Sequence, residues 1–468
     1  MSSLPELLGA ASRAAALVLL VAAPLAFGSV YREIYPVFLG TASLAGLASL
    51  ARALWCRRHG RPQAPVPGAR LLLALNVLVL IQVTPLPPAL ARVLSPTSFS
   101  YYQTVFRLGP EAWRPISVNT SLTWQGLFFL CALSLFYAGV FREFGQEGRA
   151  RMLATTIVVV ATLATLVGFV QRASADPNSI YGIWKPPQAV QVFGPYPNRS
   201  HYAGYVVMAI PLALGLAVEA LFLTRRLWSR RARGFTALGE PEGSVAALRL
   251  MLVLFNVAGV LAAGSRTAVL ACAVSVGAVL VALGRRLVWP ALVMAIIAGV
   301  GLALVDVDWF VRNVNLQRLE SDRLVVWRDM LRMVPDFPIF GVGWNALADA
   351  YSWRYQTVYT WGRWNEAHNE YLQVLLVTGI CGAALLAGLL WLLLRAGLRA
   401  AKQGPFGVGL LGACVANAVT NLSDFNLQIP ANAATFAAIA GLVTAYRHAS
   451  SETSGGDVSE SGDRDPND

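Results

Sequence analysis

Residues 152–170 read MLATTIVVVATLATLVGFV, a run of nineteen residues without a charged side chain. A helix of this length spans about 28 Å, close to the roughly 30 Å thickness of a bilayer's hydrocarbon core. A helix also satisfies all of its backbone hydrogen bonds in lipid, and the run is far too long for a strand of a membrane β-barrel. We therefore predict that this segment crosses a membrane as a helix.

Apolar runs of similar length recur along the whole chain of 468 residues. Hydrophobic residues make up 56% of the sequence and charged residues 13%, whereas soluble domains carry about 25% charged residues. We expect spans at 12–29, 34–54, 70–88, 121–141, 152–170, 201–223, 249–264, 267–284, 287–305, 369–394, 405–422 and 430–446. The runs at 70–88, which ends in prolines, and 249–264, which is short, are expected to be irregular. The sequence predicts an all-α polytopic membrane domain over residues 1–448, with about twelve transmembrane helices.

The arginines indicate the direction of these spans. The net charge is +12, and arginine clusters follow every second span, whereas the short connections between them hold fewer. A basic excess can indicate a nucleic-acid partner, but this alternation is the one that the positive-inside rule describes. We predict cytoplasmic termini, one large outer loop over residues 306–368, and a disordered cytoplasmic tail over residues 449–468.

Metal and disulfide chemistry have little support. The five cysteines form no CxxC pair and lie mostly inside apolar runs, and no HxxH or HExxH spacing is present. Asp306-Val307-Asp308 matches a short DxD pattern that can hold a divalent ion, but such a pattern arises easily by chance. We predict no bound metal and no cofactor.

One arginine lies where an outer connection enters an apolar run. Asn198-Arg199-Ser200-His201 follows two prolines and leads into the span at 201–223. Free backbone N–H groups at a helix start favour an anion, so Arg199 is a candidate anion-binding residue, supported by Asn198. The alternative is an interfacial arginine that reaches toward lipid head groups.

A second arginine follows a very short outer connection, Gly264-Ser265-Arg266-Thr267. Ser265 can cap the next helix, which would hold Arg266 at membrane depth. A guanidinium fork beside exposed backbone N–H groups suits a pyrophosphate. The alternative is that Arg266 pairs with a structural carboxylate.

The predicted outer loop contains a helical segment over residues 316–334. At about 100° per residue, Arg328 and Arg332 share a face of this helix, whereas Arg323 points well away from them. For most of these arginines a solvated or membrane-surface face is the better interpretation. Gly341-Val342-Gly343, further along the loop, is a turn rather than a nucleotide loop, because no strand precedes it and no GK[ST] follows.

His368, one of only four histidines, closes the loop between Glu366 and Glu370. An imidazole is the usual group for taking a proton from a hydroxyl near neutral pH, so His368 is a candidate general base. A structural interfacial histidine is the alternative. Asp424 and Asn426, in the last outer loop, either orient His368 or an arginine, or cap the final helix.

Together, these outer segments resemble the O-antigen ligase and polymerase superfamily over about residues 165–445. Asn198–Gly204 resembles the family's NRNHFAG stretch, and Ser265-Arg266 resembles its SR turn. The core family pattern is matched from Asp322-Arg323 through Gly341-Val342-Gly343 to His368-Asn369-Glu370-Tyr371-Leu372, and Asp424-Phe425-Asn426-Leu427 resembles a common family ending.

The resemblance implies a GT-C-like fold, similar to other polytopic glycosyltransferases, in the bacterial inner membrane. It implies transfer of a glycan from undecaprenyl pyrophosphate to a hydroxyl of lipid A-core, of another glycan or of a protein at the periplasmic face. An O-antigen ligase of lipopolysaccharide biosynthesis and a polymerase of exopolysaccharide type both fit. The family members are similar to inverting, metal-independent transferases.

The resemblance also implies roles for individual residues. Arg266 and Arg199 would hold the pyrophosphate, and His368 would act as base or position the acceptor hydroxyl. Arg323 or Arg328 would help to neutralise the leaving group. Supporting positions would be Asn198, Asn369 and Asp424.

Two other functions compete with a transferase. A transporter of polysaccharide or lipid-linked glycan would suit many spans and buried arginines, but it should show charged or broken helices near the middle of the membrane. A receptor could use the large loop, but the cytoplasmic connections contain no output domain. The distinctive residues gather at one predicted face, which favours an enzyme.

Overall fold

The computed structural model describes residues 3–186, 191–228, 241–284, 320–357 and 364–453. Within these residues the chain is helical and contains no strand. The predicted span at 287–305, and with it Asp306 and Asp308, lies outside the described residues. The helices are α1 (Leu4–Leu25), η1 (Phe27–Ser29), α2 (Tyr35–Arg58), α3 (Ala69–Val83), α4 (Pro88–Leu94), α5 (Pro96–Val105), α6 (Thr120–Glu143), α7 (Glu147–Ala173), α8 (Arg199–Trp228), α9 (Pro241–Ala263), α10 (Arg266–Leu283), α13 (Glu320–Leu331), η5 (Val334–Asp336), α14 (Leu347–Arg354), α15 (Glu370–Ala401), α16 (Pro405–Thr420), η6 (Asn426–Gln428) and α17 (Pro430–Thr453).

Eight of the described helices are long and apolar enough to cross a membrane, namely α1, α2, α6, α7, α8, α9, α10 and α15. Helices α3 and α16 are apolar but shorter. The prediction of an all-helical, multi-pass membrane protein is therefore confirmed. The count of twelve spans and the orientation of the chain stay predictions.

Some boundaries differ from those expected. Helix α9 extends over Pro241–Ala263 and is longer than its apolar run. Helix α3 ends at Val83, before the prolines that close the run at 70–88. Helix α17 continues to Thr453, a few residues into the predicted tail. Apolar runs mark the lipid-solvated part of a helix, whereas polar first and last turns extend beyond it.

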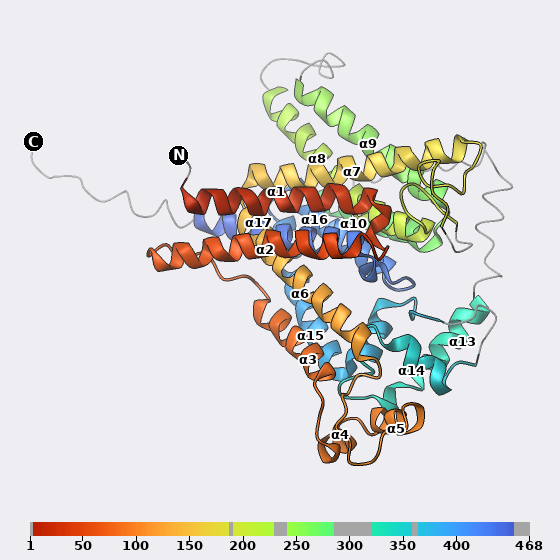
Figure 1. Cartoon of the computed structure of the whole chain (residues 1–468). Coiled ribbons are helices and arrows are strands. Elements are labelled where there is room, and N and C mark those ends of the chain that lie inside the picture. Colours follow the sequence, from red (N-terminus) through yellow and green to blue (C-terminus); the bar gives the residue numbers. More distant parts are fainter. Residues whose placement is uncertain (1–2, 187–190, 229–240, 285–319, 358–363, 454–468) are drawn as a thin grey trace, which may run out of the picture.

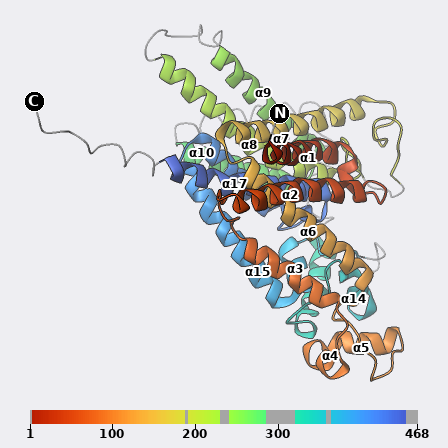
Figure 2. The ribbon, with the colours of Figure 1, turned by 60° about the vertical axis from the view of Figure 1, so that its left-hand side comes forward.

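Long helices lie side by side in a bundle that includes α1, α2, α7, α16 and α17, and the start of α1 and the end of α17 lie on the same side (Figure 1). Helices α3, α6 and α15 run obliquely from this bundle to α4, α5 and α14, which both views place at its far end (Figure 2). One apolar core fills the bundle, and a second joins α3 and α6 to α13, α14 and the start of α15. Helices α13 and α14 are therefore a folded part of the protein, packed against α3, α6 and α15.

Helix α15 is not the continuous span that the sequence predicts. Gly379 has φ 61° and ψ −166°, which interrupts the helix. The segment between η5 and α14 fills the interruption: the Val342 N–H donates to the Leu376 carbonyl at 2.9 Å, and the Ile380 N–H donates to the Pro338 carbonyl at 2.8 Å. The backbone groups that the break frees are thus paired without water.

Gln82, near the end of α3, holds the same loop segment. Its side-chain amide donates to the carbonyls of Phe340 and Val377 at 2.5 and 2.7 Å, and its oxygen accepts from the Trp344 N–H at 3.1 Å. The Trp344 ring packs on α6 at Gly126, where a Cβ would lie 2.2 Å from the ring. These contacts fix the loop against α3, α6 and α15, close to the start of α15.

Candidate functional site

Three helices begin at the same end of the protein, at Arg199 (α8), Arg266 (α10) and Glu370 (α15). Arg199 lies within electrostatic range of Arg266 and of Arg172, the last basic residue of α7. Helix starts carry unpaired N–H groups and the positive end of the helix dipole. The structure therefore gathers positive charge here from both side chains and backbone.

The caps of α8 and α10 differ. The Asn198 side chain accepts from the Ser200 N–H at 2.8 Å, so it caps the start of α8 and fixes the position from which Arg199 leaves the backbone. Ser265 occupies the N-cap position of α10, but its side chain forms no capping hydrogen bond. The capping role that the sequence allows for Ser265 is therefore not fulfilled, and the first N–H groups of α10 receive no side-chain acceptor from it.

The α16–α17 loop (residues 421–429) connects these arginines to the large outer loop. Arg323, on α13, donates to the Ser423 carbonyl at 3.1 Å and lies within electrostatic range of Asp424 and Arg266. Burial lowers the pKa of Arg323, Asp424 opposes this, and Arg266 adds to it. Arg328 is exposed on the same helix. The structure thus brings Arg323 to the other arginines and leaves Arg328 apart.

His368 lies at the centre of this arrangement, two residues before α15 begins. Its backbone is left-handed, with φ 51°. Its ring makes an edge contact with Phe425, at 4.8 Å between centroids, and Phe425 makes a similar contact with His201 at 4.9 Å. The Nδ1 atom of His368 is buried and has no hydrogen-bond partner among the described residues. A histidine with a strained backbone and a buried ring nitrogen that is unused among the described residues is a candidate substrate contact.

The electrostatics of His368 favour the neutral ring. Burial, with smaller contributions from Arg323 and His201, lowers the pKa of His368 to about 4, and Asp424 opposes the shift. At neutral pH the ring therefore stays uncharged and can accept a hydrogen bond. Such an imidazole is a weak base, so holding a hydroxyl in position is at least as important as removing its proton.

Asn369 and Asp424 support the geometry around His368. The Asn369 side chain accepts from the Leu372 N–H at 3.0 Å, which caps α15, and donates to the Leu422 carbonyl at 3.0 Å. Asp424 accepts from the Phe425 N–H at 2.9 Å. Asn369 therefore ties the start of α15 to the α16–α17 loop, whereas Asp424 stabilises the turn of that loop.

Two carboxyl groups flank His368, the half-buried Glu366 and the buried Glu370, and the sequence alone gives them no role. Burial and the neighbouring Glu370 raise the pKa of Glu366 to about 8, against a hydrogen bond from Gln373 that opposes the shift. Glu370 accepts from Gln428 at 2.7 Å through one oxygen, and its other oxygen, Oε2, has no partner among the described residues. In the sequence, the only indication that these carboxyl groups belong to the candidate site is that Glu366 and Glu370 lie on either side of His368.

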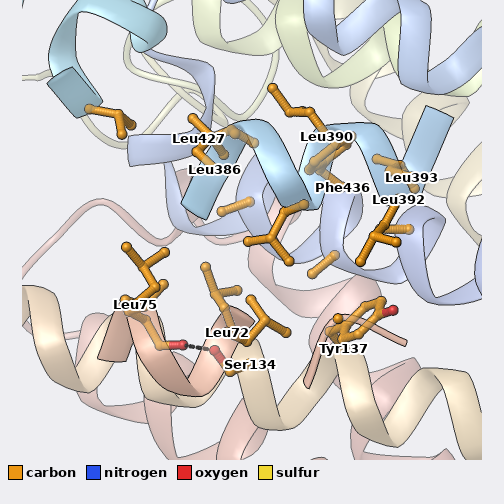
Figure 3. Close-up of a pocket in the computed structure, with 18 of the residues that line it drawn as sticks. Leu72, Leu75, Ser134, Tyr137, Leu386, Leu390, Leu392, Leu393, Leu427 and Phe436 are labelled. Carbon is orange, nitrogen blue, oxygen red and sulfur yellow. Dashed lines mark hydrogen bonds between the residues drawn. The ribbon is translucent and has the colours of Figure 1, made fainter. Parts of the chain in front are cut away.

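A cavity of about 230 Å³ lies beside this centre, between α3, α6, α15 and α17. Figure 3 shows Leu72 and Leu75 on one side of it and Leu386 and Leu390 on the other. Glu370 lines the cavity together with residues of the α16–α17 loop. An apolar cavity with a few polar groups is the usual form of a ligand site.

The described residues contain no group of three or more His, Cys, Asp or Glu side chains that could hold a metal ion. The predicted independence of a metal therefore needs a direct test, because Asp306 and Asp308 lie outside those residues.

A family model described as O-antigen ligase matches residues 251–387 of the chain. The match confirms the resemblance found in the sequence, and it includes Arg266, Arg323 and His368. Arg199 and Asp424 lie outside the matched residues and join the site through its geometry. No curated protein matches the chain.

Proposed function

We propose, from this relationship to the O-antigen ligase and polymerase superfamily, that the chain transfers a glycan from undecaprenyl pyrophosphate to an acceptor hydroxyl at the outer membrane face. The observation that carries the proposal is the gathering of Arg199, Arg266 and Arg323 beside His368, whose Nδ1 has no partner among the described residues. The active site would face the periplasm of a bacterial inner membrane.

The arginines suit the leaving group. Transfer breaks the bond between the anomeric carbon and the pyrophosphate oxygen, so negative charge grows on the departing polyprenyl pyrophosphate. Arg199 and Arg266, at two helix starts, would hold this group, and Arg323 would add a further guanidinium. In a site that excludes water, fixed cations of this kind stabilise the transition state strongly. The donor is already activated, so no nucleotide-binding fold is required.

His368 suits the acceptor. The acceptor oxygen forms the new bond to the anomeric carbon, and its proton passes to the neutral imidazole or to water that this imidazole orients. Asp424 opposes the lowering of the His368 pKa and so favours the imidazolium, whereas Arg323 disfavours it and promotes release of the proton. Attack from the face opposite the pyrophosphate would invert the anomeric centre.

The test is a transfer assay with purified protein, undecaprenyl-pyrophosphate glycan and several acceptors. We expect wild-type transfer and its loss in His368→Ala, with expression and melting temperature unchanged. His59→Ala is the matched control, because His59 is exposed and follows α2 at the opposite end of the spans.

The products distinguish the members of the superfamily. Transfer to lipid A-core would identify a ligase, elongation of the lipid-linked glycan a polymerase, and modification of a polypeptide a protein-glycosylating enzyme. Binding of the lipid-linked glycan without transfer to any acceptor would contradict the proposal and favour a transporter.

A further inference from the structure

A second group of arginines lies at the end of the bundle opposite the candidate site. Arg13 of α1 and Arg52 of α2 both donate to the carboxylate of Glu143, the last residue of α6, at 3.2 and 2.8 Å. Glu143 is buried, and a Cβ at Gly9 of α1 would lie 3.0 Å from its Oε2 atom. Glycine at this position therefore lets α1 approach the carboxylate closely.

Arg149, in the first turn of α7, completes the group. It lies within electrostatic range of Arg13, Arg52 and Glu143, and its guanidinium is 3.5 Å from the Glu143 backbone carbonyl. Helix α7 runs from here to Arg172, which lies within electrostatic range of the candidate site. At 1.5 Å per residue, Arg149 and Arg172 are about 35 Å apart along the helix. The two groups of arginines are therefore separate sites.

Three guanidinium groups surround one carboxylate here, so two positive charges are left over. Among the described residues, Arg13 and Arg52 form ion pairs with Glu143 alone, and Arg149 forms none. The side chains of Arg13 and Arg52 are only 25% and 27% exposed. The Arg52 Nε–H is buried and has no hydrogen-bond partner within the described part of the chain. The group thus combines surplus charge with an unused donor.

Ordinary basic residues at helix ends need no ligand, because water and lipid head groups surround them. Arg57 and Arg58, which end α2, are exposed and of this kind. Arg13, Arg52 and Arg149 differ, because they are half-buried and converge from three helices on one carboxylate. Like charges held together away from bulk water cost free energy, and an anion between them would offset that cost.

A phosphate suits these donors, since a guanidinium fork matches two phosphate oxygens. The position of the group indicates a lipid as its source. Helices α6 and α7 are long and apolar enough to cross a membrane, and the chain reverses between Glu143 and Glu147, so this turn marks a membrane surface. Leu44 and Leu47, which precede Arg52 on α2, are 55% and 51% exposed, as expected for side chains that face acyl chains.

We propose that Arg13, Arg52 and Arg149 bind the phosphate of an anionic phospholipid, whose acyl chains lie along the apolar surface of the adjoining spans. The surplus positive charge favours a head group with a net negative charge over a zwitterionic one, whose own ammonium group would oppose the arginines. The site lies far from the candidate active site, and the inference does not rest on the proposed function.

The test measures lipid binding to the purified full-length protein in neutral detergent, by titration followed with native mass spectrometry. Phosphatidylglycerol supplies an anionic phosphodiester, and phosphatidylcholine supplies the same phosphodiester with its charge cancelled. We expect phosphatidylglycerol to bind at least about tenfold more tightly. Equal binding of the two lipids would overturn the proposal, because apolar contacts alone would then account for it.

Arg149→Gln is the decisive variant, because it removes one cation and no ion pair among the described residues. Binding of phosphatidylglycerol should weaken at least about tenfold, the equivalent of one charge-assisted hydrogen bond. Arg58→Gln is the matched control, since it removes the same charge from an exposed position of α2. It should bind as wild type does. Unchanged binding in Arg149→Gln, or equal weakening in both variants, would refute the site.

Glu143→Gln changes the charge in the opposite direction while keeping an acceptor oxygen. It should strengthen phosphatidylglycerol binding, a gain that damage to the fold does not imitate, and weaker binding by the folded variant would contradict the proposal. Millimolar inorganic phosphate should not displace the lipid; displacement would assign the arginines to a soluble phosphate instead. Deletion of residues 454–468, which are rich in Asp and Glu, should leave binding unchanged, and an increase would make this tail the competing anion.

Discussion

Gln82→Leu should release the large outer loop from the membrane helices. Gln82 is fully buried and bonds to the carbonyls of Phe340 and Val377 and to the Trp344 N–H. The Val377 carbonyl keeps a second donor, the Gly343 N–H at 3.2 Å. Two groups are then left unpaired, and at about 1–3 kcal/mol each the substitution costs about 2–6 kcal/mol.

Amide hydrogen exchange measures this loss of stability in the loop segment itself. The Val342 and Gly343 N–H groups donate into the break of α15, and they exchange only when the loop segment lifts away. A cost of about 2 kcal/mol already corresponds to an exchange rate about 30-fold faster at these amides. Glycan transfer should fall as well, because the same loop ends in His368.

Gln103→Leu is the control, since Gln103 is exposed on α5 and its loss removes no buried hydrogen bond. If exchange at Val342 and Gly343 were the same in wild type, Gln82→Leu and Gln103→Leu, the loop would not be held by the contacts described, and the reasoning would fail.

Four further predictions concern the reaction itself. Arg266→Lys should lose at least about tenfold in transfer, because an ammonium lacks the two-pronged fork that matches a phosphate; full activity would show that charge alone suffices. Because the pKa of His368 is lowered to about 4, kcat/KM should stay level between about pH 7 and 5 and fall only below that, as protonation removes the neutral ring. Arg323→Gln removes a cation that opposes this protonation, so its acid limb should lie at higher pH than that of wild type; an unchanged limb would contradict the role of Arg323. EDTA should leave transfer unchanged, and strong inhibition restored by a divalent ion would return the Asp306 and Asp308 pair to consideration as metal ligands.

The sequence predicts well the features that depend on local chemistry. Uncharged runs long enough for a bilayer mark α7 and α10 directly. Arg199 and Arg266 were expected at helix starts, and each is the first residue of its helix. Helix periodicity separated Arg323 from Arg328, and in the structure the first is half-buried and the second is exposed. In each case the residues that are adjacent in the sequence are sufficient to predict the feature.

Other features depend on contacts between distant segments and could not be predicted. Glycine is common in transmembrane helices, so Gly379 gave no sign of a break that the segment between η5 and α14 fills. The free oxygen of Glu370 and the free N–H of Trp344 line one cavity because α6, α15 and the loop meet there. His368 was predicted as a base, but its lowered pKa results from burial and from Arg323, which is 45 residues earlier in the chain.

The break in α15 bears on the choice between enzyme and transporter. Transporters use broken helices at the middle of the membrane to present free backbone groups to a substrate or ion. In α15 the groups freed at Gly379 are already used: the Leu376 carbonyl accepts from Val342, and the Ile380 N–H donates to Pro338. Opening this break to a substrate would require the outer loop to leave and its hydrogen bonds to be lost in an apolar environment. The break thus anchors the loop that ends in His368, which favours a fixed site at one face of the membrane over a path through it.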